Sequence, residues 1–123
     1  MKILAIEDCF VTYYLLEGIL KDCQIDKISS FKEALNINYS DYKLIFLDLH
    51  LESYDDDITR VESGIPIYQH IRKYSNLPII FFTADSYDSF KSYISEDKNA
   101  YYLSKYPPTE TSLIDLVNAI TRL

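Results

Sequence analysis

Short apolar runs alternate along the chain with segments in which apolar residues recur at every third or fourth position. Uninterrupted apolar runs of four or five residues are typical of strands that are buried on both faces of a sheet. Four strong runs and one weaker run, the second of the series, are expected to be strands: Ile3–Ile6, Ile25–Ser30, Leu44–Leu47, Pro78–Phe82 and Ala100–Leu103.

The intervening segments have helical periodicity of differing strength. The first stripe consists of Leu15, Leu16, Ile19, Leu20 and Cys23, and Pro66 is a good first-turn residue for the third helix. The fourth segment is polar, and the last has a clear apolar stripe. The expected helices cover residues 15–23, 31–36, 66–74, 88–95 and 113–120.

A strand followed by a helix, repeated five times, is typical of a parallel sheet. Strands that are separated by helices run parallel through right-handed crossovers, which place helices on both faces of the sheet. We therefore predict an α/β fold, a doubly wound five-stranded parallel sheet, in a single domain over residues 1–123. Ligands of such sheets bind beyond the carboxyl ends of the strands.

Composition and charge narrow the classes of function. Apolar residues make up 48% and charged residues 25% of the chain, which is ordinary for a soluble globular domain. The net charge of −7 argues against direct nucleic-acid binding, which needs a basic face. No apolar run is long enough for membrane insertion, and Cys9 and Cys23 form no C-x-x-C motif. We expect a cytoplasmic protein with reduced thiols.

Reactive side chains follow four of the five predicted strands. Glu7 and Asp8 end the first strand, Asp48 ends the third, Thr83 ends the fourth, and Lys105 follows the fifth. The carboxyl ends of parallel strands lie at one edge of a sheet, so these side chains are expected to converge on one crevice. A buried carboxylate such as that of Asp48 needs a partner, because its desolvation costs several kcal/mol.

The chemistry of this set points to a metal and a phosphoryl group. Three carboxylates repel one another, and a divalent cation relieves that repulsion. Hard oxygen ligands suit Mg²⁺, which keeps several waters and leaves room for a phosphoryl group. A carboxylate beside the metal can attack phosphorus, while Lys105 and Thr83 can neutralise and hydrogen-bond the transferred oxygens.

The sequence resembles the receiver domain of bacterial response regulators across essentially its whole length. The matching segments are "ILAIED", "LIFLDLHL", "SGIPIYQHIRK", "LPIIFFTAD" and "AYYLSKYPP". The interval of 22 residues from Thr83 to Lys105 is of the kind that this family shows between the same two roles. The resemblance implies a flavodoxin-like (βα)5 fold and a signalling switch rather than an enzyme.

The resemblance also implies residue roles at the crevice. Asp48 would accept the phosphoryl group, and it would ligate Mg²⁺ together with Asp8 and the backbone carbonyl of His50, with Glu7 in support. The phosphoryl donor would be a histidine kinase or a phosphotransfer protein of a two-component system or phosphorelay.

Three further residues would carry the response to phosphorylation. Thr83 would be the switch hydroxyl, Lys105 the conserved ammonium of the family, and Tyr102 the aromatic residue whose rotamer reports activation. Phosphorylation would alter the surface near the last helices, where a downstream target protein would bind. An alternative is that Tyr102 is simply a core aromatic residue, since the chain has 12 tyrosines.

The sequence departs from the family pattern at several places, including the usual Met-Pro after Asp48 and the Gly before Ala100, which are both absent. Tyr106 separates Lys105 from Pro107, so we expect the cis peptide bond that family members commonly hold here at Tyr106–Pro107. The interval from Asp48 to Gly64 is 16 positions, about twice the family's usual length.

The long interval after Asp48 is expected to be a surface loop. Residues 52–63 are polar and acidic and lack Gly, so we predict that they form no tight turn. We expect at least one of Tyr54, Ile58 and Val61 to anchor the loop, with Asp55 to Asp57 in water. The loop would shade the crevice as a lid, add a docking edge beside it, or have no kinetic role.

Two other functions compete with phosphoryl acceptance. A degenerate receiver would act as a protein-binding module without phosphorylation, although all the key side chains are present. A phosphatase of the haloacid-dehalogenase type also uses an aspartyl nucleophile after a strand, but its D-x-D motif is absent from Asp48-Leu49-His50.

Overall fold

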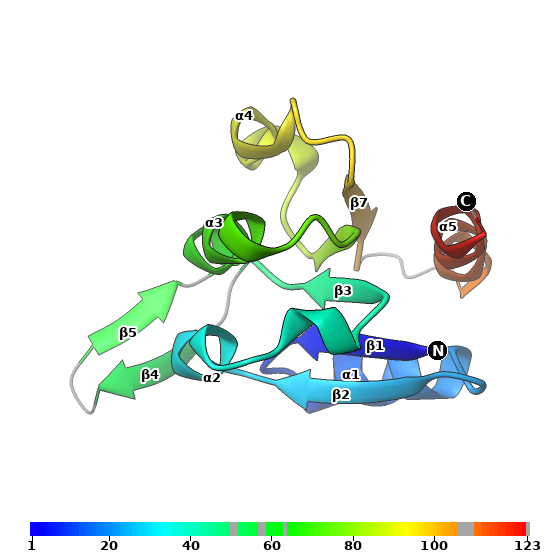
Figure 1. Cartoon of the computed structure of the whole chain (residues 1–123), viewed down its shortest axis with the longest axis horizontal. Helices are drawn as coiled ribbons and strands as arrows, with labels where there is room; N and C mark the ends of the chain where they lie inside the picture. The colour runs from blue at the N-terminus through cyan, green and yellow to red at the C-terminus, as the bar shows by residue number, and fades with distance from the viewer. Residues whose placement is uncertain (50–51, 57–58, 63, 106–109, 123) are drawn as a thin grey trace.

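A five-stranded parallel sheet forms the centre of the molecule in the computed structural model, which describes residues 1–49, 52–56, 59–62, 64–105 and 110–122 (Figure 1). The strand order is β2-β1-β3-β6-β7, so the predicted α/β fold is confirmed. The strands are β1 (Lys2–Ile6), β2 (Gln24–Ile28), β3 (Leu44–Leu47), β6 (Ile79–Thr83) and β7 (Ala100–Ser104). The three central strands are apolar because both of their faces are covered.

Helices cover both faces of the sheet. Residues of α1 and α5 pack on one face, and residues of α2, α3 and α4 pack on the other. The helices are α1 (Phe10–Ile19), α2 (Phe31–Leu35), α3 (Gly64–Tyr74), α4 (Lys91–Ile94) and α5 (Glu110–Thr121), with 3-10 turns η1 (Tyr39–Asp41) and η2 (Tyr87–Ser89). No helix within these described ranges is long and apolar enough to cross a membrane.

Two predicted helices differ most from the observed ones. The first ends at Ile19 instead of including Cys23, because the chain must turn back to pair Gln24 with the start of β1. The fourth is broken at Phe90, whose φ of −140° lies outside the helical range. Phe90 is buried against Phe81 and Tyr102, so packing of its ring outweighs continuation of the helix.

The predicted surface loop after Asp48 is wrong in part, because the chain forms a two-stranded antiparallel sheet there. This hairpin consists of β4 (Glu52–Asp56) and β5 (Thr59–Glu62), with Asp56 opposite Thr59. A polar segment can form such a ribbon because cross-strand hydrogen bonds satisfy its backbone. The expected anchoring by Tyr54, Ile58 or Val61 concerns side chains outside the described part, as does the exposure of Asp55 to Asp57.

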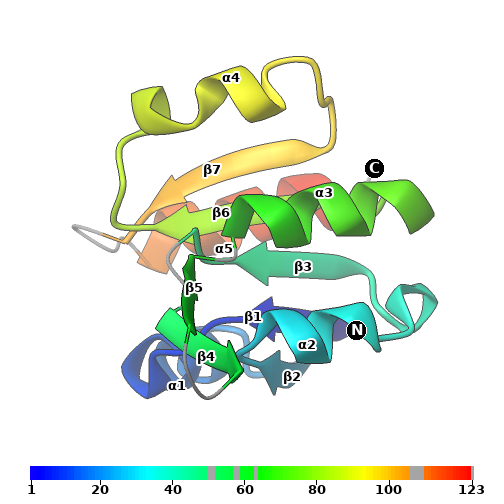
Figure 2. The same cartoon turned by 90° about the vertical axis from the view of Figure 1, so that its left-hand side faces the viewer.

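The hairpin leaves the carboxyl edge of the large sheet and lies against α2 (Figure 2). Its two ends meet where the backbone N–H of Gly64 donates to the carbonyl of Leu49, at 3.2 Å. A Cβ on Gly64 would overlap the backbone of Leu49, with its carbonyl carbon only 2.7 Å away. Glycine therefore permits the close contact that begins α3 beside the end of β3.

A network of polar side chains holds the end of α3 to the turn before β7. The carboxylate of Asp97 accepts from Arg72 Nε and from the hydroxyl of Tyr68, each at 2.6 Å. Other guanidinium nitrogens of Arg72 donate to the carbonyls of Leu77 and Asn99. Burial opposes the charge of Asp97, but Arg72 and Tyr68 outweigh it and keep the pKa of this carboxyl below its usual range.

Candidate functional site

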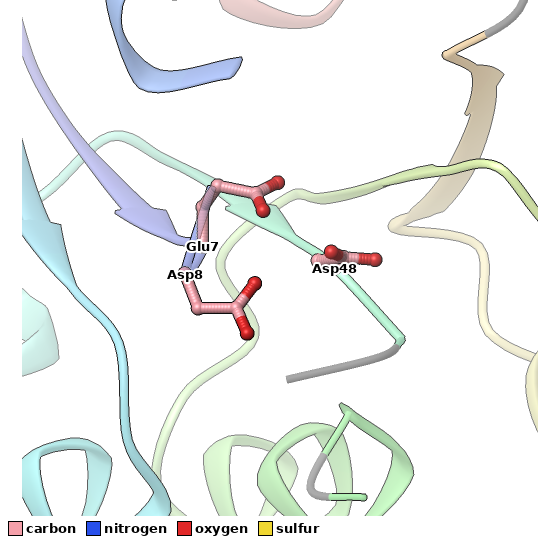
Figure 3. A group of neighbouring side chains, drawn as sticks. All are labelled: Glu7, Asp8 and Asp48. Carbon is pink, nitrogen blue, oxygen red and sulfur yellow. The ribbon is translucent and has the colours of Figure 1, made fainter. Parts of the chain in front are cut away.

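Three carboxylates meet at the carboxyl edge of the sheet, as the sequence predicts. One oxygen each from Glu7, Asp8 and Asp48 lies within 4.8 Å of the others (Figure 3). Glu7 and Asp48 are only 3% and 7% exposed, whereas Asp8 is half-buried. This spacing lets all three carboxylates approach a single cation.

Backbone pairing between neighbouring strands places the acids. The N–H of Asp48 donates to the carbonyl of Ile6 at 3.0 Å, and the N–H of Glu7 donates to that of Ile28 at 2.9 Å. Both acids thus continue the ladder one residue beyond the strands. Because β1 and β3 are adjacent and parallel, their carboxyl ends bring Glu7 and Asp48 side by side.

Lys105 joins the two buried acids. Its ammonium lies 2.8 Å from a carboxylate oxygen of Glu7 and 3.1 Å from one of Asp48. The backbone N–H of Lys105 donates to the carbonyl of Thr83 at 2.9 Å, which ties it to the end of β6. The other carboxylate oxygen of Glu7 accepts from the N–H of Cys9 at 3.1 Å. Glu7 therefore positions the ammonium beside Asp48.

Electrostatics at the crevice favour an added positive charge. Burial, followed by the nearby charge of Asp48, raises the pKa of Glu7 to about 7, although Lys105 acts in the opposite direction. Burial lowers the pKa of Lys105, but hydrogen bonds and charge from Glu7 and Asp48 outweigh it, so the pKa rises and Lys105 stays protonated. One ammonium thus contacts two of the three acids in the cluster, so acidic groups outnumber the basic one at the crevice.

Thr83 and Tyr102 are connected through the backbone of Asp85. The fully buried hydroxyl of Thr83 accepts from the N–H of Asp85 at 3.2 Å, and the hydroxyl of Tyr102 donates to the carbonyl of Asp85 at 2.8 Å. The Tyr102 ring packs against the rings of Tyr87 and Phe90, with centroid distances of 5.8 and 5.7 Å. Tyr102 is thus half-buried and also hydrogen-bonded to the segment after Thr83.

Sequence reasoning missed the part played by the Asp85 backbone and by Gly64. A threonine two residues before a polar loop residue often bonds that residue's N–H, which is a local signal for the Asp85 contact. Gly64 is one of only two glycines in the chain, yet its contact with Leu49 spans fifteen positions and has no local signal. The His50 carbonyl and the Tyr106–Pro107 bond lie outside the described residues.

Comparison with known proteins relates this arrangement to solved structures. No protein-family model matches the sequence, and no curated protein sequence matches it significantly. A two-component response regulator from Clostridium difficile is 30% identical and superposes with a TM-score of 0.80, over 99% of this chain and 96% of that one.

Two further structures share the fold. The N-terminal domain of a response regulator/sensory box/GGDEF protein from Carboxydothermus hydrogenoformans is 25% identical, with a TM-score of 0.76 over 99% of this chain and 94% of that one. The receiver domain of a sensor histidine kinase from Pseudomonas aeruginosa, solved with magnesium coordinated in its active-site cleft, is 19% identical. Its TM-score is 0.71 over 99% of this chain and 98% of that one. By its fold and its similarity to these proteins, this chain belongs to the receiver domain family of response regulators.

Proposed function

We propose that this receiver domain accepts a phosphoryl group on Asp48 in a Mg²⁺-dependent reaction and passes the change to a partner protein. The observation that carries the proposal is the contact of Asp48 with the Lys105 ammonium within a cluster of three carboxylates. The donor would be a histidine kinase or a phosphotransfer protein. The test is Mg²⁺-dependent labelling of the protein by acetyl phosphate, followed by intact mass; an unlabelled protein would leave a binding role without phosphorylation.

The residues at the crevice fit a magnesium ion. Asp8 and Asp48 would bind the ion through carboxylate oxygens, Glu7 would support them, and the His50 carbonyl is expected to be a further ligand. Hard oxygen donors in a negatively charged crevice are the ligands that Mg²⁺ prefers. When bound, Mg²⁺ would neutralise the oxygens of the transferred group. The Pseudomonas relative, which is described with magnesium in its cleft, supports this assignment.

The side chains around Asp48 suit phosphoryl transfer. A carboxylate oxygen of Asp48 would attack phosphorus, forming an acyl phosphate, while the bond from phosphorus to the donor atom breaks and its electron pair leaves with the donor. Lys105 already contacts Asp48 and would pair with an oxygen of the transferred group. A carboxylate nucleophile has no proton to lose, so the step needs no general base.

The bonds of Asp85 offer a route from the phosphoryl group to the surface. The Thr83 hydroxyl accepts from the Asp85 N–H in the present structure, and it would donate to a phosphoryl oxygen after transfer. A shift of the Thr83 hydroxyl toward the phosphoryl group would change the position of the Asp85 backbone. The hydrogen bond that Tyr102 donates to the Asp85 carbonyl would change with it. The surface beside α4 and α5 would then change for a target protein.

Magnesium is expected to stabilise the protein. An ion that binds only the folded state raises the melting temperature by about 3–7 °C when its concentration is roughly tenfold above Kd. Asp8→Asn should relieve carboxylate repulsion and reduce the response to Mg²⁺. Differential scanning fluorimetry with Mg²⁺ and with equal ionic strength of NaCl measures both effects. Equal melting curves in the two salts would contradict the metal site.

The stabilisation by Mg²⁺ is expected to depend on pH. Glu7 has a pKa of about 7 in the metal-free folded protein, raised from 4.5, so its contribution to stability is fully present below pH 4.5 and is lost as pH rises to about 7. Bound Mg²⁺ favours the ionised acid, so its stabilising effect should be greater at pH 8 than at pH 6. Melting temperatures measured with and without Mg²⁺ at the two pH values give the change in stabilisation. Glu7→Gln should reduce this dependence on pH.

The hairpin is expected to affect docking more than hydrolysis. β4 lies against α2, on the β1 side of the crevice and away from β6 and β7, whose ends carry Thr83 and Lys105 (Figure 2). Replacing residues 53–61 with a short Gly-Ser link should therefore leave the lifetime of phosphorylated Asp48 within about twofold of that of the intact chain. Time courses after removal of acetyl phosphate measure this lifetime. Decay several times faster would instead make the hairpin a lid that excludes water.

A further inference from the structure

The side chain of Lys105 crosses a strand of the sheet to reach the acids. Lys105 follows β7, whereas Asp48 follows β3 and Glu7 follows β1. Strand β6 lies between β7 and β3, so the lysine side chain passes over the end of β6 (Figure 2). The ammonium still lies within 3.1 Å of Asp48. The side chain of β6 under this path therefore forms the surface on which the ammonium rests.

Phe82 is the residue of β6 on that face of the sheet. Side chains alternate between the two faces along a strand, and Phe82 packs in the core under α1 and α5, together with Phe46 and Leu103. Asp48 and Lys105 come two residues after Phe46 and Leu103, and their backbone N–H groups continue the ladder. The side chains of Asp48 and Lys105 are thus on the same face as Phe82.

The ring of Phe82 lies under the ammonium. Lys105 Nζ is 6.0 Å from the ring centroid, and Phe82 is only 2% exposed. The ring of Phe46 meets the ring of Phe82 at 6.1 Å with an interplanar angle of 68°, an edge-to-face contact that fixes its orientation. A cation within about 6 Å of a ring is attracted by the negative face of the ring, more strongly where water is excluded.

We propose that Phe82 is a positioning residue whose ring holds the Lys105 ammonium in place beside Asp48. The inference rests on the proposed function, in which this ammonium pairs with an oxygen of the transferred group. Holding a lysine side chain in one extended conformation costs entropy, which the contact with the ring offsets in part. Phosphoryl transfer changes the charge on Asp48, whereas the ring is unchanged by the reaction and keeps the ammonium in place throughout.

Phe82→Leu tests this role, because leucine keeps an apolar side chain in the core but has no ring face. With acetyl phosphate and saturating Mg²⁺, labelling of Asp48 should slow about fivefold. The Mg²⁺ concentration for half-maximal labelling should not change, since the ring acts on Lys105. Phe81→Leu is the matched control: it removes the neighbouring ring of β6, which is equally buried but packs in the core on the opposite face, and should label at the wild-type rate.

Trifluorophenylalanine at position 82 separates the charge distribution of the ring from its packing. Fluorine atoms withdraw electron density from the ring face while the ring keeps nearly the same shape, so its attraction for the ammonium weakens. This variant should also slow labelling, by about threefold, while its melting temperature stays close to that of the wild type. It decides the question even if Phe82→Leu does not fold.

The reactivity of Lys105 gives a second measurement that needs no phosphorylation. An amine-acylating ester of acetic acid, followed by peptide mapping, should modify Lys105 about fivefold faster in Phe82→Leu than in the wild type, because a loosened ammonium reaches solvent more often. Phe81→Leu should react as the wild type does. A wild-type protein that acetyl phosphate never labels would contradict the proposed function, and the acylation rates would still decide the role of Phe82.

Two results would overturn the proposal. The first is an unchanged rate of Lys105 acylation in Phe82→Leu, which would show that the ring does not hold the ammonium. The second is labelling of the trifluorophenylalanine variant at the wild-type rate, or labelling of Phe81→Leu as slow as that of Phe82→Leu. Either outcome would show that Phe82 contributes only to the packing of the core.

Discussion

Asp48→Asn is expected to abolish labelling by acetyl phosphate, with a loss of at least about 1000-fold in rate. An amide has nearly the shape of the carboxylate but is far less nucleophilic, and it carries no negative charge to offset the Lys105 ammonium 3.1 Å away. Intact mass spectrometry after incubation with acetyl phosphate and Mg²⁺ measures the fraction labelled. The variant should keep its fold, because Glu7 still pairs with Lys105 at 2.8 Å.

Asp8→Asn is the matched control, since it removes one carboxylate from the same cluster and leaves the nucleophile. It should still become labelled, more slowly and only at higher Mg²⁺, because a metal ligand is weakened. Peptide mapping should place the label on Asp48 in both this variant and the wild type. Labelling of Asp48→Asn at the wild-type rate would refute the assignment of the nucleophile.

The second large effect is expected at Gly64. Gly64→Ala should lower the free energy of unfolding by about 2–3 kcal/mol, since the added Cβ would overlap the backbone of Leu49, which has no flexible end that can move aside. Leu49 follows Asp48 directly, so the same change should also disturb phosphoryl acceptance. Urea unfolding monitored by circular dichroism gives the change in stability.

Gly18→Ala is expected to change the free energy of unfolding in the opposite direction in the same assay. Gly18 lies within α1, and a Cβ there would meet no atom within 4 Å. Alanine lowers the entropy of the unfolded chain and favours the helix, so the variant should gain about 0.5–1 kcal/mol. Equal effects of the two substitutions would show that the contact between Gly64 and Leu49 does not constrain the fold.

Much of the architecture could be predicted from the sequence because the strong strands are buried on both faces. An uninterrupted apolar run such as Leu44–Leu47 is a local sign of that burial, and the alternation of strands and helices predicts that the strand runs parallel to its neighbours. The approach of Glu7, Asp8 and Asp48 was predictable for the same reason, since neighbouring parallel strands end at one edge. The family resemblance rests on these same residues.

Other features have no local signal in the sequence. Residues 52–62 contain no uninterrupted apolar run of the kind that marks the strands of the large sheet, yet Glu52–Asp56 pairs with Thr59–Glu62 as a hairpin. Phe90 interrupts a predicted helix because its ring packs between Phe81 and Tyr102, which come from other elements. In each case the competing structures differ little in local energy, so tertiary contacts decide between them.

The sequence by itself predicted the five strands of the large sheet, the acids at their ends and the resemblance to a family. Only the tertiary structure decided that Lys105 contacts both Glu7 and Asp48, that burial raises the pKa of Glu7, and that the ring of Phe82 lies under the ammonium. Periodicity is a property of neighbouring residues, and the sequence displays it directly. Distances, burial and charge coupling instead depend on how segments far apart in the chain pack together.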